Sequence, residues 1–341
     1  MATKPLLDLP PSYRPGRAHP AGVAPVAPPG TPTITLRRPA WLPGVELWSV
    51  RRSTRPWSMF YGTYAFVTAS RLEGPYECLC RQQRQHWDTA SVVVAEPGDL
   101  QVRLEPTFEA DLDFLVVAPE VVKAVLDENG PGVAGGPATR HFSSSRIDDP
   151  GLVALVSRLW GAISRITEQA TVRGGSASTW PGAPPPRRPA RAVVSASSDT
   201  VIEQQHLLRA FIRTAFESAT GREPPATIRP RDRAVARVCQ ILEQEYQNRI
   251  TLDRLARETG FSKYYLERTF HDQIGVPVHQ YLKKVRVAQA LDLLRKGQRP
   301  SAIATKTGFS DQPHLTRVFR EELGFTPRTY WAALTALTGQ A

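Results

Sequence analysis

The sequence predicts an α+β protein, with strands in its N-terminal half and helices in its C-terminal half. Short apolar runs separated by turn signals fill residues 45–117, a pattern typical of a β-sandwich or barrel. From residue 152 onward, apolar residues recur at steps of three and four, which indicates amphipathic helices. Nearly the same segment then occurs twice, at residues 260–281 and 308–330, so we expect a duplicated helical unit.

The composition indicates a protein with packed cores and no disulfides. The 341 residues suffice for two domains, and 41% of them are hydrophobic. No apolar run reaches the ~20 residues that span a bilayer, and residues 1–10 contain no signal-peptide apolar segment. We therefore expect a cytoplasmic protein that does not bind membranes. Cys78, Cys80 and Cys239 are too few for a disulfide framework. Cys78 and Cys80 would share one face of a strand, so we expect buried thiols rather than half of a metal site.

The net charge of +11 is distributed unevenly along the chain. Residues 229–330 contain 19 Lys and Arg against 11 Asp and Glu, a net charge of +8. Residues 41–171 contain 12 against 16, a net charge of −4. A basic C-terminal part predicts a polyanionic partner, and nucleic acid is the commonest one.

The N-terminal half predicts an arm followed by a strand-rich domain. Residues 1–40 are rich in Pro, Ala and Gly and predict a disordered arm. Residues 41–145 contain runs such as V-E-L-W-S-V and S-V-V-V-A, separated by turn signals such as Gly74-Pro75. The later segment V-V-K-A-V-L-D-E-N-G predicts a short helix that ends at Gly130.

Residues 146–228 predict two linker helices. Asp149-Pro150-Gly151 opens the first helix, and the second begins at about Asp199. The apolar stripe of the first helix has helical spacing and consists of Leu152, Leu155, Val156, Leu159, Ile163 and Ile166. Between the two helices, residues 172–198 are rich in Pro and Gly and predict a flexible or polyproline-like connector.

Residues 229–335 predict an all-α domain with two helix-turn-helix units. In each unit a short helix ends at a glycine, which suits the left-handed conformation. A serine two residues later caps the second helix, because its hydroxyl accepts from a free backbone N–H. The glycines are Gly260 and Gly308, and the serines are Ser262 and Ser310. The second helices are predicted at residues 263–274 and 311–323.

Each of these second helices has an apolar seam and a polar face. Leu266 and Phe270 form one seam, and Leu315 and Phe319 form the other. The opposite faces carry Tyr264, Glu267, Arg268 and His271 in the first helix, and Pro313, His314, Arg317 and Arg320 in the second. Such side chains suit the base edges of the DNA major groove, although an ordinary solvated surface is the alternative interpretation. Two units would place two helices in successive major grooves, ~34 Å apart.

This region closely resembles the C-terminal domain of AraC/XylS-type transcription regulators. The resemblance covers about residues 230–332 and is strongest in G-F-S-D-Q-P-H-L-T-R-V-F-R-E-E-L-G-F-T-P-R-T-Y. It implies base-reading roles for Tyr264, Glu267, Arg268, Gln312, His314 and Arg317. It implies DNA-backbone contacts for Ser262, Lys263, Ser310, Thr316 and Arg320. Glu267 departs from the pattern, because a neutral amide often occupies this position in the family.

The N-terminal strands fit the same resemblance less specifically, which implies a cupin-like barrel that senses a small-molecule effector. Trp57, Tyr64, Tyr76 and Trp87 are candidates to line its pocket, and packing in the core is the alternative for each. The histidine cluster of metal-binding cupins is missing, since only His86 lies among these strands. We therefore expect no metal, no cofactor and no catalysis.

The predicted function is transcription regulation through double-stranded DNA, with an effector and RNA polymerase as further partners. The linker helices resemble the segments that the family uses for dimerisation, so we expect a homodimer; packing of these helices on the chain's own strands is the alternative. One alternative function is a ligand-independent regulator whose N-terminal domain is a protein-partner surface. Another is a DNA-repair enzyme that carries the helical domain as a module, but Cys78 and Cys80 have no obvious His base nearby.

Overall fold

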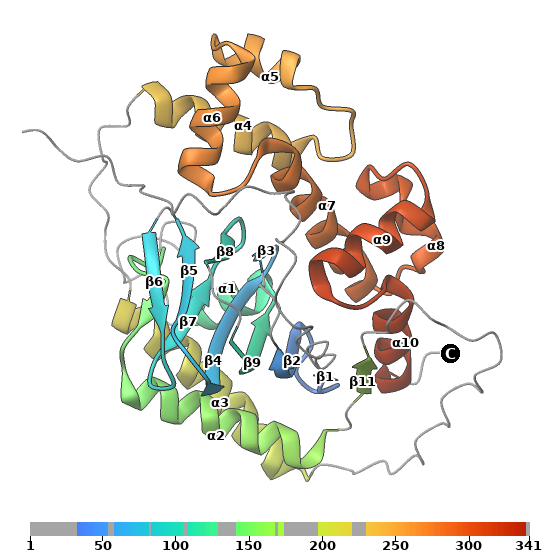
Figure 1. The fold of residues 1–341 in the computed structure, drawn as a ribbon. Helices are drawn as coiled ribbons and strands as arrows, with labels where there is room; N and C mark the ends of the chain where they lie inside the picture. Colours follow the sequence, from blue (N-terminus) through green and yellow to red (C-terminus); the bar gives the residue numbers. More distant parts are fainter. Residues whose placement is uncertain are drawn as a thin grey trace, which may run out of the picture.

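The computed structural model describes residues 33–53, 58–81, 83–104, 108–128, 141–167, 170–173, 197–219 and 230–338. Among these residues, two β-sheets and three α-helices form the first part of the chain, here called the strand domain, which ends at Ala219. Helices alone form the second part, residues 230–338, here called the helix-turn-helix domain. Figure 1 shows the two parts packed against each other. The predicted α+β class is confirmed.

The strand domain is built from two antiparallel sheets. The larger sheet has seven strands in the order β10-β7-β4-β9-β2-β1-β11. Its strands are β1 Thr33–Arg37, β2 Val45–Ser53, β4 Tyr64–Leu72, β7 Val92–Ala95, β9 Ala110–Val117, β10 Arg146–Ile147 and β11 Ala170–Arg173. The smaller sheet has the order β3-β8-β5-β6, with β3 Ser58–Phe60, β5 Tyr76–Cys80, β6 Gln83–Trp87 and β8 Leu100–Leu104.

The larger sheet is buried on both faces. Along β4, Ala65 and Val67 belong to a core that also contains Tyr76 and Trp87 of the smaller sheet. Phe66 points the opposite way, because successive side chains alternate between the faces of a sheet, and it lies in a second core shared with helices. The strand domain is therefore layered, with helices, then the larger sheet, then the smaller sheet.

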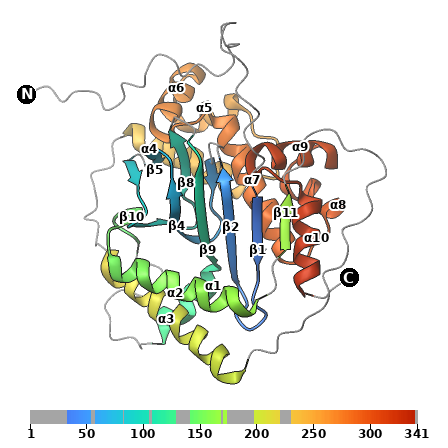
Figure 2. The same cartoon turned by 60° about the horizontal axis from the view of Figure 1, so that its bottom comes forward.

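Helices α2 Pro150–Ile166 and α3 Ser198–Ala219 cover the outer face of the larger sheet, together with α1 Pro119–Asp127. Figure 2 shows these helices lying across the strands. Asp149 caps α2, since its carboxylate accepts from the backbone N–H groups of Gly151 and Leu152. The predicted stripe of α2 is buried in this core at Leu152, Val156, Leu159 and Ile163. The stripe therefore packs on the chain's own sheet, which was the alternative to a dimer seam.

Two predicted boundaries are wrong. The expected disordered arm extended to residue 40, but Thr33–Arg37 forms β1 between β2 and β11, with Ile34 and Leu36 buried. Residues 1–32 lie outside the described chain. The expected connector began at residue 172, but residues 172–173 belong to β11, which pairs antiparallel with β1. Both short strands are held by a neighbouring strand, a stabilisation that local composition does not reveal.

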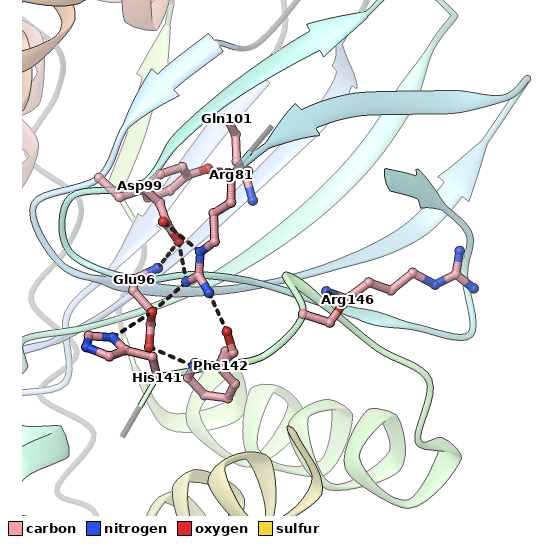
Figure 3. A network of polar contacts seen from close by, with 9 residues as sticks. Arg81, Glu96, Asp99, Gln101, His141, Phe142 and Arg146 are labelled. Carbon is pink, nitrogen blue, oxygen red and sulfur yellow. Dashed lines mark hydrogen bonds and ion pairs between the residues drawn. The ribbon is translucent and has the colours of Figure 1, made fainter. Parts of the chain in front are cut away.

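Figure 3 shows a polar network around Arg81 of the strand domain. The guanidinium of Arg81 donates to both carboxylate oxygens of Asp99 at 2.8 and 2.7 Å, to Glu96 at 2.6 Å and to the Phe142 carbonyl at 2.5 Å. Arg81 has a φ of +48°, a conformation that costs a non-glycine residue about 1–3 kcal/mol. The network compensates for this strain and fixes the turn between β5 and β6 against the turn between β7 and β8.

The helix-turn-helix domain consists of two groups of helices joined by a long one. The first group contains α4 Pro230–Gln244, α5 Leu252–Thr259 and α6 Lys263–Ile274. The second contains α8 Pro300–Ile303, the 3₁₀ helix η2 Thr305–Thr307, α9 Gln312–Leu323 and α10 Pro327–Thr338. Helix α7, Val278–Arg295, runs between them. Among the described residues, no helix combines the length and hydropathy of a membrane span.

The two domains share hydrophobic cores. Phe60, Leu79 and Val102, on the outer face of the smaller sheet, pack with α4, α6 and α7. Trp48 of β2 contacts Phe325 and Tyr330, with ring centroids 5.8 and 5.5 Å away. The helix-turn-helix domain is thus seated on the strand domain through apolar side chains from both of its helix groups.

A buried carboxylate completes this junction. Glu46 of β2 accepts from Trp48 Nε1 at 3.0 Å, from Arg295 Nε at 3.0 Å and from the Tyr330 hydroxyl at 3.0 Å. Arg295 ends α7, and Tyr330 lies on α10. Burial alone would raise the pKa of Glu46, but the charges of Arg295 and Arg38 and the hydrogen bonds from Trp48 and Arg295 hold it below the ordinary value.

The same junction explains the tyrosine repeated in both copies of the duplicated segment. Tyr281 donates its hydroxyl to Glu243 of α4 at 2.6 Å, while Tyr330 donates to Glu46 of the strand domain. Equivalent tyrosines therefore tie the first unit to its own domain and the second unit to the sheet.

Candidate nucleic-acid interface

The first helix-turn-helix unit forms where the sequence predicts it. Thr251 caps α5 by accepting from the Arg254 N–H, and Gly260 ends that helix with a φ of +71°. The hydroxyl of Ser262 then accepts from the Tyr265 N–H and starts α6. Helix α6 spans Lys263–Ile274, which confirms both predicted bounds.

Helix α6 buries one face and exposes the other. Leu266 and Phe270 are fully buried, while Tyr264 is 76% exposed. The Arg268 side chain is 70% exposed and lies 3.9 Å from Asp272, and Glu267 is half-buried. The helix therefore presents an aromatic hydroxyl, a guanidinium and a carboxylate beside its buried seam.

Sequence reasoning missed one exposed aromatic residue. Tyr265 is 45% exposed, and its ring packs edge-on against Phe261 at 4.9 Å. The repeated Y-Y of Tyr264 and Tyr265 was a signal for it, because two adjacent aromatic residues outside the Leu266–Phe270 seam cannot both be buried by that seam.

The second unit differs at its start. After the single turn of α8, the chain continues as a 3₁₀ helix that ends at Gly308 with a φ of +76°. The predicted cap of the next helix was Ser310, but the cap is Asp311, whose carboxylate accepts from the His314 N–H at 2.7 Å. Ser310 instead donates its hydroxyl to Asp311 at 2.9 Å. The bonds from the His314 N–H and from Ser310 hold the pKa of Asp311 below its usual value, which suits a charged cap at the positive helix terminus.

Helix α9 repeats the division into faces. Leu315 and Phe319 are fully buried, whereas Gln312 and Arg317 are exposed. His314 is half-buried, with its Nδ1 3.1 Å from the Ser310 hydroxyl. The exposed side chains again lie beside the buried seam and offer donors and acceptors to a ligand.

The predicted backbone-contact residues lie around the starts and flanks of these helices. Ser262, Lys263 and Ser310 are exposed, and Thr316 and Arg320 are half-buried. Lys263 forms an ion pair with Asp253 at 2.9 Å, with both side chains more than half exposed. Exposed ion pairs of this kind are worth about 0–1 kcal/mol, so the ammonium can move to a phosphate at little cost.

The candidate ligand-pocket residues do not lie together. Tyr76 and Trp87 stack at 4.7 Å and are buried between the two sheets. Tyr64 packs against Phe216 of α3 at 5.9 Å, on the other face of the larger sheet. Trp57 lies outside the described residues. Tyr64, Tyr76 and Trp87 thus pack in cores and do not line a common pocket. Core packing was the alternative interpretation of each residue.

Two clefts lie elsewhere on the strand domain. One of about 400 Å³ lies between α1 and α3 and is lined by residues that include Trp41, Val121, Ala124, Leu208 and Arg209. Another of about 340 Å³ lies at the domain junction, between residues that include Glu46 and Arg295. Among the residues that the structure describes, no group of three or more His, Cys, Asp or Glu is placed to hold a metal.

Comparison with known proteins finds matches to the helix-turn-helix domain. A family model described as "Helix-turn-helix domain" matches residues 255–333. The chain is 44% identical over 81 residues to the uncharacterized HTH-type transcriptional regulator YbfI of Bacillus subtilis (strain 168), a match that covers 24% of this chain and 30% of YbfI. It is 29% identical over 135 residues to the transcriptional regulatory protein HptR of Staphylococcus aureus, covering 36% of this chain and 54% of HptR. The chain thus spans between about a third and a half of the length of these curated relatives.

Among solved structures, fatty-acid-bound ToxT from Vibrio cholerae aligns with a TM-score of 0.41 and 12% identity, over 93% of this chain and 99% of ToxT. The family match begins within α5 and includes α6, α8 and α9. Residues 255–333 therefore form a helix-turn-helix domain of the AraC type.

Proposed function

We propose that this chain is a sequence-specific DNA-binding transcription regulator that reads two successive major grooves with α6 and α9. One observation carries the proposal: a single basic domain holds two capped helices, each with an exposed polar face beside a buried seam. The base-reading residues are Tyr264, Glu267 and Arg268 on α6, and Gln312, His314 and Arg317 on α9.

The chemistry of these side chains matches base edges. An arginine donates two hydrogen bonds to guanine O6 and N7, a glutamine pairs with adenine N6 and N7, and a carboxylate accepts from cytosine N4. Arg268 and Arg317 would therefore read guanines, Gln312 an adenine and Glu267 a cytosine. Ser262, Lys263, Ser310, Thr316 and Arg320 would contact the DNA backbone around the helices that they start or flank.

DNA binding by the full-length chain is expected to weaken steeply with salt, because phosphate neutralisation releases counterions. Fluorescence anisotropy with a labelled duplex pool measures this. The affinity should fall by about 10³-fold or more between about 50 and 200 mM salt. Lys263→Met should make the log–log salt slope shallower by about one, while Lys123→Met, which removes an exposed charge from α1 of the strand domain, should leave the slope unchanged. Absence of binding at the lowest salt concentration would refute the proposed function.

The proposal places a small-molecule effector in the cleft between α1 and α3. Its volume of about 400 Å³ lies within the range of ~300–1,000 Å³ for small-molecule sites. Trp41, Val121 and Leu208 supply apolar walls, and Arg209, which lies 3.2 Å from Glu128, supplies a charged group. The packed positions of Tyr76 and Trp87 favour the second candidate, a ligand-independent regulator whose strand domain is a protein-partner surface.

The proposal also includes a homodimer, with RNA polymerase as a further partner at the regulated promoter. The apolar stripe of α2 is buried against the chain's own sheet. The dimer contact would therefore lie on the outer surface of α2 and α3, where Ile202 of α3 is 50% exposed.

Native mass spectrometry of the purified full-length chain is expected to show twice the chain mass plus a bound small molecule. Ala124→Trp, which fills the cleft, should remove the small molecule and keep the dimer. A ligand-free dimer in the wild type would favour the ligand-independent regulator, and a monomer at micromolar concentration with and without DNA would rule out the dimer.

The proposed regulator has no catalytic role and no cofactor. It would act on chromosomal DNA in the cytoplasm. Burial raises the pKa of the Cys78 thiol to about 12 and that of Cys80 to about 11. Neither cysteine is therefore a thiolate nucleophile at neutral pH, which argues against the DNA-repair alternative.

A further inference from the structure

The middle of α7 carries an arginine that holds the start of the first helix-turn-helix unit. Arg286 donates from Nε to the Tyr246 carbonyl at 2.8 Å and from a terminal nitrogen to the Asn248 carbonyl at 3.0 Å. Both carbonyls lie in the segment between α4 and α5. They follow the C-terminus of α4, where the helix dipole favours a cation.

The turn of the second unit lies against two of these residues, Tyr246 and Arg286. A Cβ atom at Gly308 would lie 2.5 Å from the Tyr246 carbonyl oxygen and 2.9 Å from Arg286 Nε. No side chain fits in so short a gap. Gly308 directly precedes the segment that caps α9, so the turn before one recognition helix touches the segment that leads into the other unit.

A second α7 cation holds α9 itself. Lys284 is 8% exposed and donates to Glu322 of α9 at 2.5 Å and to the Ser58 carbonyl at 2.9 Å. Because Lys284 fastens α9 to the long helix, the distance between the two units depends on how firmly the first unit is held to that helix. Arg286 is one of the α7 side chains that hold the first unit, together with Tyr281, which donates to Glu243 of α4.

We propose that Arg286 is a positioning residue for DNA recognition: with Gly308, it sets the separation of α6 and α9 and thereby the base-pair spacing that the domain accepts. The inference rests on the proposed function. Successive base pairs lie about 3.4 Å apart along the helix axis, so a shift of that size between the units would change the register by one base pair. The planar guanidinium suits the task, because its fixed fork holds two carbonyls in one geometry, which an ammonium does not.

The test measures spacing selectivity with the full-length chain. The wild-type chain first selects its binding site from a random duplex library. This site is then compared with duplexes in which one base pair is inserted or deleted between its two base clusters. Wild-type affinity should fall about tenfold or more on either change, because one unit loses its base contacts. The affinities of Arg286→Met for the original and altered sites should differ by less than about threefold. The difference for Arg286→Lys should lie between that of the wild type and that of Arg286→Met.

Gly308→Ala provides a second variant with a matched control. Gly308 and Gly260 both have positive φ values, +76° and +71°, so alanine strains both turns alike. A Cβ at Gly260 has no atom within 4 Å, whereas one at Gly308 meets Tyr246 and Arg286. Gly308→Ala should therefore lose spacing selectivity, and Gly260→Ala should keep it.

The outcomes separate this inference from the proposed function. If Arg286→Met and Gly308→Ala fold, by circular dichroism and thermal melting, and retain wild-type spacing selectivity, the inference is overturned. If Arg286→Met does not fold, the inference is tested by comparing Gly308→Ala with Gly260→Ala. Equal spacing selectivity of these two variants would then overturn it. If the wild type selects no site at all, the proposed function fails instead.

Discussion

Glu46→Gln is expected to lower the free energy of unfolding by about 3–5 kcal/mol, because it leaves the Arg295 guanidinium without a counter-charge in a buried site. Glu46 is 4% exposed, and the Arg295 side chain is 14% exposed. The substitution also weakens the bonds from Trp48 and Tyr330 to the carboxylate. Urea denaturation followed by tryptophan fluorescence measures the loss, with Trp48 as a probe inside the junction.

Two further variants distinguish the buried pair from ordinary surface charge. Asp127→Asn removes the carboxylate of an exposed pair with Lys123 and should cost less than about 1 kcal/mol. Combining Glu46→Gln with Arg295→Met should recover much of the lost stability, because the isolated charge is then gone. A loss for Glu46→Gln as small as that for Asp127→Asn would contradict the role assigned to this junction.

The same pair predicts a pH dependence with a definite sign. The pKa of Glu46 is held below its ordinary value of about 4.3. A carboxyl group whose pKa is lower in the folded state stabilises the fold above its unfolded pKa. That stabilisation is lost as the pH falls below about 4.3 and through the lower folded pKa. The stability difference between wild type and Glu46→Gln should therefore be constant near neutral pH and shrink below about pH 4.

Arg268→Ala and Arg317→Ala are each expected to relax specificity at a different cluster of bases. Both side chains are mostly exposed, and their partners Asp272 and Glu321 lie on the same helix. A bidentate arginine–guanine contact contributes about 1–3 kcal/mol of discrimination, so the double variant should lose about twice that. Selection of binding sites from a random duplex library measures the effect.

The matched control is Arg158→Ala, which removes the same charge from an exposed position on α2. It should leave both base clusters intact. If either Arg268→Ala or Arg317→Ala selects the wild-type motif unchanged, the corresponding helix does not read bases.

Helices α6 and α9 were the most predictable part of the molecule, because their determinants are local. The spacing of Leu266 and Phe270, the glycine turn at Gly260 and the Ser262 cap lie within a few residues of one another. The sequence predicts Ser310 as the cap of α9, whereas the cap is the next residue, Asp311. Both residue types are good caps, so the sequence alone does not distinguish them. Only the position of the His314 N–H shows that Asp311 accepts the bond.

Elements that depend on distant partners were not predictable. β1 has only Ile34 and Leu36 as alternating apolar residues, and its pairing with β2 and β11 holds it in the sheet. The Glu46–Tyr330 contact joins residues 284 positions apart, a separation at which local patterns carry no information. Tyr76 and Trp87 are aromatic residues of the kind that often line binding sites. Their burial between two sheets depends on the tertiary fold, which local sequence does not reveal.

Methylation protection with dimethyl sulfate on the selected site tests the central claim most directly, because the reagent modifies guanine N7 in the major groove. Two recognition helices on one chain predict two protected clusters on one face of the duplex, about one helical turn of 10–10.5 base pairs apart. Arg268→Ala should abolish protection in one cluster and Arg317→Ala in the other. A single protected cluster, or protection that neither substitution changes, would contradict the account.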